Sequence, residues 1–295
     1  MSNSPTNQRF VKKNGMSAGF AQRFIAGEHM EQTIEPVRHL NALGMTASLD
    51  YLGENVYKAQ EARESVEYYR RLFKFIFDNR LDANVSLKLT QLGLDISDEL
   101  ATANMREILD EAAKYEQFVR IDMEGSLYTE RTLQIFFKLW EDHKNFGTVI
   151  QTYLYRSEAD VHRMIDARAR VRLVKGAYNE PKEVAYPDKK DVDASYLRLS
   201  EELLLHGTYP AIATHDPLII NATNKFVGTN NIAASDFEYQ MLYGIQRDLQ
   251  KQLVNDGFRM RVYVPFGTQW YGYMMRRLAE RPANLWFVLK NLLRN

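Results

Sequence analysis

The chain has 295 residues, of which 45% are hydrophobic, 26% charged and 12% aromatic, and its 38 acidic residues balance its 38 basic ones. Because it has no cysteine, disulfides, thiolate metal sites and cysteine nucleophiles are excluded. A net charge of zero without a basic cluster argues against a protein that binds nucleic acid.

The N-terminal region divides into two parts. Residues 1–16 are polar and lack both hydrophobic periodicity and the apolar core of a signal peptide, which predicts a flexible tail. From 17 to 43, apolar residues recur at three- and four-residue spacings with a break near Ala26-Gly27, which predicts two short amphipathic helices. No stretch of the chain approaches the roughly 18 apolar residues of a membrane span. We therefore expect a cytoplasmic protein whose contact with the inner face of the membrane is peripheral at most.

Eight short β-prone segments alternate with longer helical segments between residues 44 and 295. Strands are predicted at 45–49, 84–89, 118–123, 148–153, 171–175, 211–215, 237–242 and 261–265. Helices are predicted at 56–79, 97–115, 129–144, 157–169, 194–205, 217–226, 244–255 and about 269–280, followed by an apolar run at 284–293. Eight such units predict an α/β fold, a (β/α)8 TIM-like barrel that forms one catalytic domain, with a doubly wound open sheet as the alternative.

Polar side chains gather on one face of these strands, near the strand ends. Alternate residues of a barrel strand point inward, and the C-terminal strand ends form the mouth of the barrel. In the second strand this alternation directs Ser86 and Lys88 inward and Val85, Leu87 and Leu89 toward the helices. In the other strands it directs the following residues inward: Arg120, Asp122, Gln151, Arg172, Leu242 and Tyr263. Because an unpaired buried charge costs several kcal/mol, these charges indicate a functional site at the mouth.

Two cationic features could bind an anionic ligand there. Arg276 and Arg277 follow the eighth strand on a predicted helix, one turn after Tyr273, and could form a fork for a carboxylate; the alternative is a solvated basic pair. Lys88 could pair with Asp122 and a substrate carboxylate, form a Schiff base, or close the barrel rim in a salt bridge.

The cofactor chemistry is less well defined by the residues themselves. His215 ends the sixth strand and could act as a metal ligand, an acid/base or a hydrogen-bond donor to a cofactor. No second histidine lies at ligand spacing, so we expect no metal site. Gly176 ends the fifth strand and allows close approach of a bound group. The chain has neither G-x-G-x-x-G nor a Walker loop, which disfavours a Rossmann-bound dinucleotide and P-loop chemistry.

Seven motifs, in order along the chain, resemble those of the bacterial proline dehydrogenases and of the matching domain in the bifunctional proline utilisation A proteins. The resemblance runs from about residue 24 to 287. The motifs are SLDYLGE (48–54), SLKL (86–89), IDME (121–124), IQTY (150–153), RLVKGAY (172–178), ATH (213–215) and YMMRRLAE (273–280).

This resemblance implies a distorted barrel that holds FAD at its C-terminal face without a Rossmann domain. Such enzymes oxidise L-proline to pyrroline-5-carboxylate by hydride transfer to the flavin, and the electrons pass to a membrane quinone. The resemblance implies Lys88, Asp122 and Arg172 as catalytic residues and a Glu54–Arg276 ion pair as a gate over the substrate. The substrate-binding residues that it implies are Lys88, Leu242, Tyr263, Tyr273, Arg276 and Arg277. The FAD-binding residues that it implies are Gln151, Arg172, Lys175, Gly176, Ala177, Ser195 and His215.

Two other functional classes remain alternatives at this point. One is a Schiff-base aldolase or lyase that uses Lys88, and the other is a catalytically inactive barrel that binds an amino acid. Within the family resemblance, Tyr263 favours unsubstituted proline, because relatives that act on hydroxyproline have a smaller residue at the corresponding place.

Overall fold

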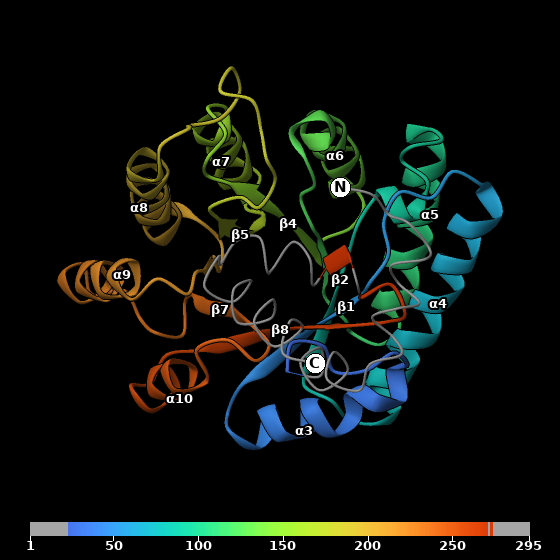
Figure 1. Ribbon diagram of the computed structural model, residues 1–295, viewed down its shortest axis with the longest axis horizontal. Coiled ribbons are helices and arrows are strands. Elements are labelled where there is room, and N and C mark those ends of the chain that lie inside the picture. Colours follow the sequence, from blue (N-terminus) through green and yellow to red (C-terminus); the bar gives the residue numbers. More distant parts are fainter. Residues whose placement is uncertain (1–22, 271, 274–295) are drawn as a thin grey trace, which may run out of the picture.

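A closed barrel of eight parallel strands, arranged in sequence order, forms the centre of the molecule (Figure 1). The computed structural model describes residues 23–270, 272 and 273. The strands are β1 (Thr46–Tyr51), β2 (Ala83–Leu87), β3 (Val119–Ile121), β4 (Phe146–Gln151), β5 (Arg170–Val174), β6 (Ala211–Ala213), β7 (Glu238–Leu242) and β8 (Met260–Phe266). All eight predicted strands are therefore confirmed to within a few residues at their ends, and the open sheet is excluded.

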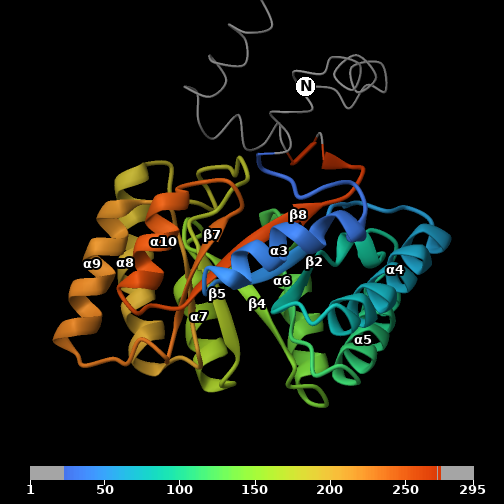
Figure 2. The ribbon, with the colours of Figure 1, turned by 90° about the horizontal axis from the view of Figure 1, so that it is seen from below.

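Helices surround this barrel on the outside (Figures 1 and 2). They are α4 (Ala59–Asp78), α5 (Asp98–Ala113), α6 (Ser126–Trp140), α7 (Ser157–Asp166), α8 (Lys189–His206), α9 (Pro217–Thr229) and α10 (Arg247–Asn255), with a short 3-10 turn, η2 (Thr90–Leu92), after β2. Helix α8 begins five residues before the predicted start. The prediction missed these residues because the first turn of the helix is charged and lacks an apolar periodicity. None of the helices in the described part of the chain is long and apolar enough to cross a membrane.

The N-terminal segment supplies one further member of the helix ring. A 3-10 turn, η1 (Met30–Thr33), leads into α3 (Ile34–Ala42), which buries Val37 and Leu40. This helix lies outside the barrel between α10 and α4 (Figure 1), where a regular (β/α)8 barrel has the helix that follows its last strand. The predicted tail at 1–16, most of the first predicted N-terminal helix, most of the predicted helix at 269–280 and the run at 284–293 lie outside the described residues.

The outward faces of the strands form the apolar core. Val85 and Leu87 of β2 and Leu89 after it are fully buried in one hydrophobic cluster, as the alternation predicts. Tyr69 and Phe73 of α4 belong to the same cluster. The core therefore lies between the strands and the helices, which leaves the barrel interior to other residues.

The barrel interior is filled largely by polar side chains. Arg120 of β3 is 2% exposed, and its Nη1 donates to the carbonyl oxygens of Thr148 (3.1 Å) and Arg170 (2.7 Å). Gly147 of β4 makes room for this guanidinium, because a Cβ there would lie 2.7 Å from Arg120 Nη1 and 2.3 Å from the Arg170 carbonyl oxygen. Ordinary barrels fill this space with branched apolar residues. The polar filling shows that the interior is not built for stability alone.

Candidate active site

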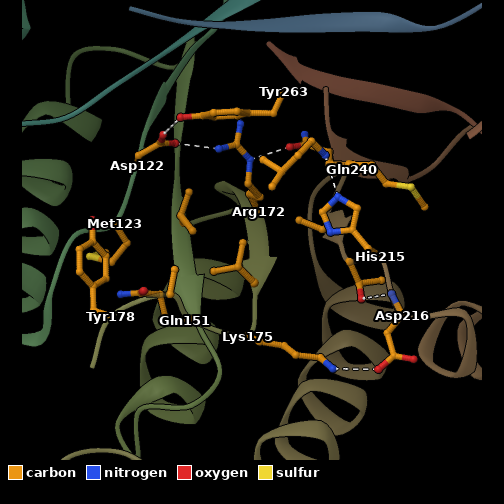
Figure 3. A pocket seen from close by; sticks show the side chains of 18 of the residues that line it. Asp122, Met123, Gln151, Arg172, Lys175, Tyr178, His215, Asp216, Gln240 and Tyr263 are labelled. Atoms are coloured by element: carbon orange, nitrogen blue, oxygen red, sulfur yellow. Dashed lines mark hydrogen bonds and ion pairs between the residues drawn. The ribbon is translucent and has the colours of Figure 1, made fainter. Parts of the chain in front are cut away.

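A cavity of about 690 Å³ opens at the C-terminal ends of the strands (Figure 3). Eleven of the residues expected at the site line it: Lys88, Asp122, Gln151, Arg172, Lys175, Gly176, Ala177, His215, Leu242, Tyr263 and Tyr273. Arg276 and Arg277 lie outside the described residues. The structure thus brings together side chains from seven of the eight strands, near their C-terminal ends, which is where barrel enzymes place their active sites.

Lys88 is held by Asp50, a residue of β1. Its Nζ lies 3.4 Å from Asp50 Oδ1, and the two side chains are almost fully buried. Burial by itself lowers the pKa of Lys88, but the carboxylates of Asp50 and Asp122 outweigh it and hold that pKa above its usual value. Burial likewise raises the pKa of Asp50, and the Lys88 ammonium offsets part of that rise. Of the alternatives left open for Lys88, a direct ion pair with Asp122 is not found; Lys88 pairs with Asp50, and Asp122 pairs with Arg172.

Asp122 instead binds Arg172 and Tyr263. Arg172 Nη1 donates to Asp122 Oδ1 at 2.7 Å, and the Tyr263 hydroxyl donates to Asp122 Oδ2 at 2.6 Å (Figure 3). The Arg172 guanidinium also lies over the Tyr263 ring, 5.1 Å from its centroid. Burial raises the pKa of Tyr263 well above its usual value, and the neighbouring carboxylates raise it further. Tyr263 therefore remains a phenol and a hydrogen-bond donor.

Arg172 has further hydrogen-bond partners among the polar side chains of the barrel interior. Its Nε donates to Gln240 Oε1 at 2.6 Å, and its Nη2 donates to Ser86 Oγ at 3.0 Å. Only 5% of the residue is exposed. The guanidinium is thus held on several sides at the floor of the cavity, where a fixed cation can stabilise a developing negative charge.

His215 fixes the end of β7. Its Nε2 accepts a hydrogen bond from the backbone N–H of Leu242 at 2.9 Å. An imidazole nitrogen that accepts a hydrogen bond carries no proton of its own. The neutral His215 ring therefore has its proton on Nδ1. Among the described residues no three His, Asp or Glu side chains are placed to hold a metal ion. The structure therefore gives His215 a positioning contact within the protein.

A second charged group lies at the other end of the cavity. Lys175 Nζ lies 3.1 Å from Asp216 Oδ2 (Figure 3) and 2.5 Å from Asp193 Oδ1. Lys189 also approaches Asp216, at 3.6 Å. Side-chain hydrogen bonds from Lys175 and the nearby ammonium charges hold the pKa of Asp216 below its usual value, although burial by itself would raise it. Two lysines and two carboxylates thus share this end.

Position 176 has no room for any residue larger than glycine, because the side chain of Tyr153 lies against it. Its φ is +123°, a conformation that other residues rarely adopt, and a Cβ would lie 2.5 Å from the ring of Tyr153. Ser195 is the one expected cofactor-binding residue that does not line this cavity. It is buried in α8, where its Oγ donates to the Thr152 carbonyl oxygen at 2.9 Å. Gly176 therefore lines the cavity, whereas Ser195 is bonded to the backbone of the segment that follows β4.

The loop that carries Glu54 is attached to a buried carboxylate. Glu124 accepts hydrogen bonds from Thr90 Oγ1 at 2.6 Å and Thr90 N at 3.2 Å, and Thr90 Oγ1 accepts from the backbone N–H of Asn55 at 3.1 Å. Burial raises the pKa of Glu124 to about 7, although Thr90 and Lys88 lower it in part. The expected partner of Glu54, Arg276, lies outside the described residues, so the gate stays a prediction.

Three polar residues of the site were missed from the sequence. Asp50 and Gln240 point inward by the same strand alternation that identified Lys88 and Arg172, and Glu124 follows β3 two residues after Asp122. The signal was therefore present for Asp50 and Gln240. Nothing in the sequence, however, indicates which charged side chain each would contact.

Comparisons with known proteins point to one family. Residues 33–290 match the family described as Proline dehydrogenase. The chain is 46% identical to proline dehydrogenase 1 of Bacillus subtilis subsp. natto, over all of this chain and 97% of the relative. It is 41% identical to the proline dehydrogenase of Deinococcus radiodurans, over 93% of this chain and 90% of the relative.

Among solved structures, the chain is similar to proline utilization A of Bdellovibrio bacteriovorus inactivated by N-propargylglycine. The TM-score is 0.84 and the sequence identity 29%, over 91% of this chain. The chain spans about a third (33%) of the length of that protein. The similarity therefore concerns one part of the larger protein.

Proposed function

The chain belongs to the proline dehydrogenase family of oxidoreductases, and from this premise we propose that it oxidises L-proline to pyrroline-5-carboxylate with bound FAD as hydride acceptor and a quinone as final electron acceptor. One observation carries most weight. Two buried cations, Lys88 and Arg172, line a cavity at the barrel mouth, and carboxylates hold both in place. A cavity of this kind suits a small anionic substrate beside an acceptor that becomes more negative on reduction.

The residues of the cavity fit a flavin. Its volume of about 690 Å³ is within the usual range for cofactor sites. Gln151 uses its amide NH₂ on the Glu124 carbonyl oxygen at 2.8 Å, which leaves its own carbonyl oxygen as an acceptor for a ring N–H. Arg172 supplies a donor at the cavity floor, and Lys175 and Lys189 supply cations for phosphate at the far end. FAD bound there would supply the two-electron hydride acceptor.

The substrate carboxylate is assigned to Lys88. This ammonium keeps its proton, because Asp50 and Asp122 hold its pKa high, and it lines the cavity although only 8% of the residue is exposed. By resemblance, Arg276 and Arg277 complete the carboxylate clamp, and Glu54 pairs with Arg276 above it. Leu242, Tyr263 and Tyr273 line the same cavity and would contact the pyrrolidine ring; Asp122 fixes Tyr263 through its hydroxyl.

The protonation of Lys88 counts against the aldolase alternative. A Schiff base forms only from a neutral amine, so enzymes that use one lower the pKa of their lysine. Here the neighbouring carboxylates raise that pKa. Lys88 therefore suits a role as a fixed cation and not as a nucleophile.

An anaerobic absorption experiment tests the proposed function. The protein, purified and supplied with FAD, is expected to show bound flavin absorption that L-proline bleaches and a soluble quinone restores. L-alanine, which has the same charged groups without the ring, is the matched control and should leave the flavin oxidised. A protein that binds no flavin, or whose flavin L-proline does not reduce, would contradict the proposal. Inactivation by borohydride in the presence of substrate would instead support the aldolase.

A further inference from the structure

A chain of hydrogen bonds crosses the barrel interior and ends on Arg172. Arg172 Nε donates to Gln240 Oε1 at 2.6 Å, and Gln240 Nε2 donates to Glu238 Oε1 at 2.5 Å. Arg261 Nε in turn donates to Glu238 Oε1 at 2.9 Å. Glu238 and Gln240 are each 3% exposed, and they occupy successive inward positions of β7. The chain thus links the N-terminal end of β7 to the floor of the cavity.

The direction of the Gln240 amide follows from its two neighbours. A carboxylate only accepts hydrogen bonds and a guanidinium only donates them, whereas an amide has one end of each kind. The NH₂ of Gln240 must therefore face Glu238, and its carbonyl oxygen must face Arg172. With a neutral residue in place of Glu238 the NH₂ of Gln240 loses its charged acceptor, and the amide is held firmly only at its oxygen end, by Arg172.

The charge on Glu238 is well secured. Arg261 Nε lies within 3.1 Å of both carboxylate oxygens, and the Tyr209 hydroxyl donates to Oε2 at 3.2 Å. Burial favours the neutral acid, but the Arg261 charge outweighs it and holds the pKa of Glu238 below its usual value. Glu238 is thus a permanent acceptor at the lower end of the chain.

We propose that Glu238 and Gln240 are positioning residues, which act through Arg172 to fix the direction of its guanidinium at the cavity floor and so set how strongly it stabilises the reduced flavin. The inference rests on the proposed function. Glu238 does not line the cavity, whereas Gln240 does, with its carbonyl oxygen bound to Arg172 and its NH₂ bound to Glu238. Asp122 and Ser86 hold the Nη atoms of Arg172, and Gln240 holds Nε, so the loss of this bond lets the guanidinium pivot about the remaining contacts.

The first test is Glu238→Gln, which removes the charge and keeps the shape. We expect the FAD content to stay unchanged while flavin reduction by L-proline, measured by anaerobic stopped flow, slows on the order of tenfold to a hundredfold. The reduction potential of the bound flavin should become more negative, because a misdirected cation stabilises the reduced form less. A crystal structure of the variant should show the Gln240 amide displaced from its place in the parent, with a longer or lost bond to Arg172 Nε.

Two further variants keep the test decisive. Gln240→Met removes the acceptor for Arg172 Nε but leaves the Glu238–Arg261 pair in place, so it applies even if Glu238→Gln does not fold; the same changes are expected. Tyr239→Phe is the matched control. It lies on the same strand between the two residues, is fully buried, and its hydroxyl donates to Asn224 Oδ1 at 2.5 Å. We expect Tyr239→Phe to be less stable than the parent protein but to keep the parent's rate of flavin reduction and the parent's flavin reduction potential.

The results separate the two proposals. Parent-like rate, potential and Arg172 direction in the folded variants would overturn the positioning role. A parent protein that binds no FAD, or is not reduced by L-proline, would contradict the proposed function, and the direction of Arg172 in the variant structures would still decide whether Glu238 and Gln240 position it.

Discussion

The two faces of the same barrel strands differ sharply in chemistry. On β3, Val119 and Ile121 face the helices in a fully apolar layer, whereas Arg120 between them lies inside the barrel. On β7, Tyr239 belongs to the apolar layer, whereas Glu238 and Gln240 belong to the interior chain. Neighbouring residues of one strand thus belong either to the apolar layer or to the polar interior, because successive side chains of a strand point to opposite faces.

This division teaches how the fold can carry a charged site. Buried ion pairs contribute little net stability, since desolvation of the charges offsets their attraction. The dry layer between strands and helices must therefore provide most of the stability. The interior is then left to hold Lys88 and Arg172 in fixed positions.

The largest expected effect comes from breaking the apolar layer. Phe136 of α6 is fully buried and packs against Phe146 (4.7 Å between ring centroids) and Trp140 (5.3 Å). Phe136→Ala should lower the free energy of unfolding by about 3–5 kcal/mol, measured by urea denaturation. The folded variant should reduce its flavin at the parent rate. A loss below about 1 kcal/mol would show that this layer is not the main source of stability.

Removing the Arg172 charge from the barrel interior should slow flavin reduction and leave the packing of the apolar layer unchanged. Arg172→Met is expected to slow flavin reduction by L-proline on the order of 10²- to 10³-fold, because the fixed positive charge at the cavity floor is lost. Stopped-flow traces of folded, FAD-loaded variant and parent make the comparison. Equal rates in the two proteins would rule out the role assigned to Arg172.

Glu124 offers a further test of the contrast between the apolar layer and the charged site, because it is a buried acid near the barrel mouth. Its pKa in the folded protein is raised from 4.5 to about 7, mainly by burial, so the folded state binds the proton more tightly than the unfolded chain. Its contribution to stability is therefore present below pH 4.5 and is lost as the pH rises through about 7. The size of this loss is roughly 3 kcal/mol.

Glu124→Gln should remove this pH dependence. The free energy of unfolding of the variant minus that of the parent is expected to be larger at pH 8 than at pH 5. Thermal or urea unfolding of both proteins at the two pH values measures this difference. Comparing the two proteins cancels the other groups that titrate in this range. A stability difference that is the same at both pH values would show that Glu124 does not titrate in this window.

The smallest expected effect is on substrate binding. Lys88→Met keeps the length of the side chain but removes its charge, and it should weaken L-proline binding by roughly 10- to 100-fold, the usual worth of one charge-assisted hydrogen bond. FAD content should not change. An unchanged dissociation constant for L-proline in titrations of the oxidised enzyme would refute the assignment of Lys88 to the carboxylate.

Much of the fold and the cavity lining could be predicted from the sequence. Strand period and helix period are local properties, so the eight strands and seven of the surrounding helices were found from spacing alone. The same period of two directed Lys88, Asp122 and Arg172 inward. The place of α3 in the helix ring could not be predicted, because it depends on packing against distant strands.

The sequence by itself determined which side chains enter the barrel, because alternation along a strand needs only the strand. Only the tertiary structure decided their partners. Lys88 meets Asp50 across 38 residues, Arg172 meets Gln240 across 68, and Arg172 meets Ser48 across 124. Such contacts depend on the closure and register of the whole barrel, in which each strand is aligned by both neighbours.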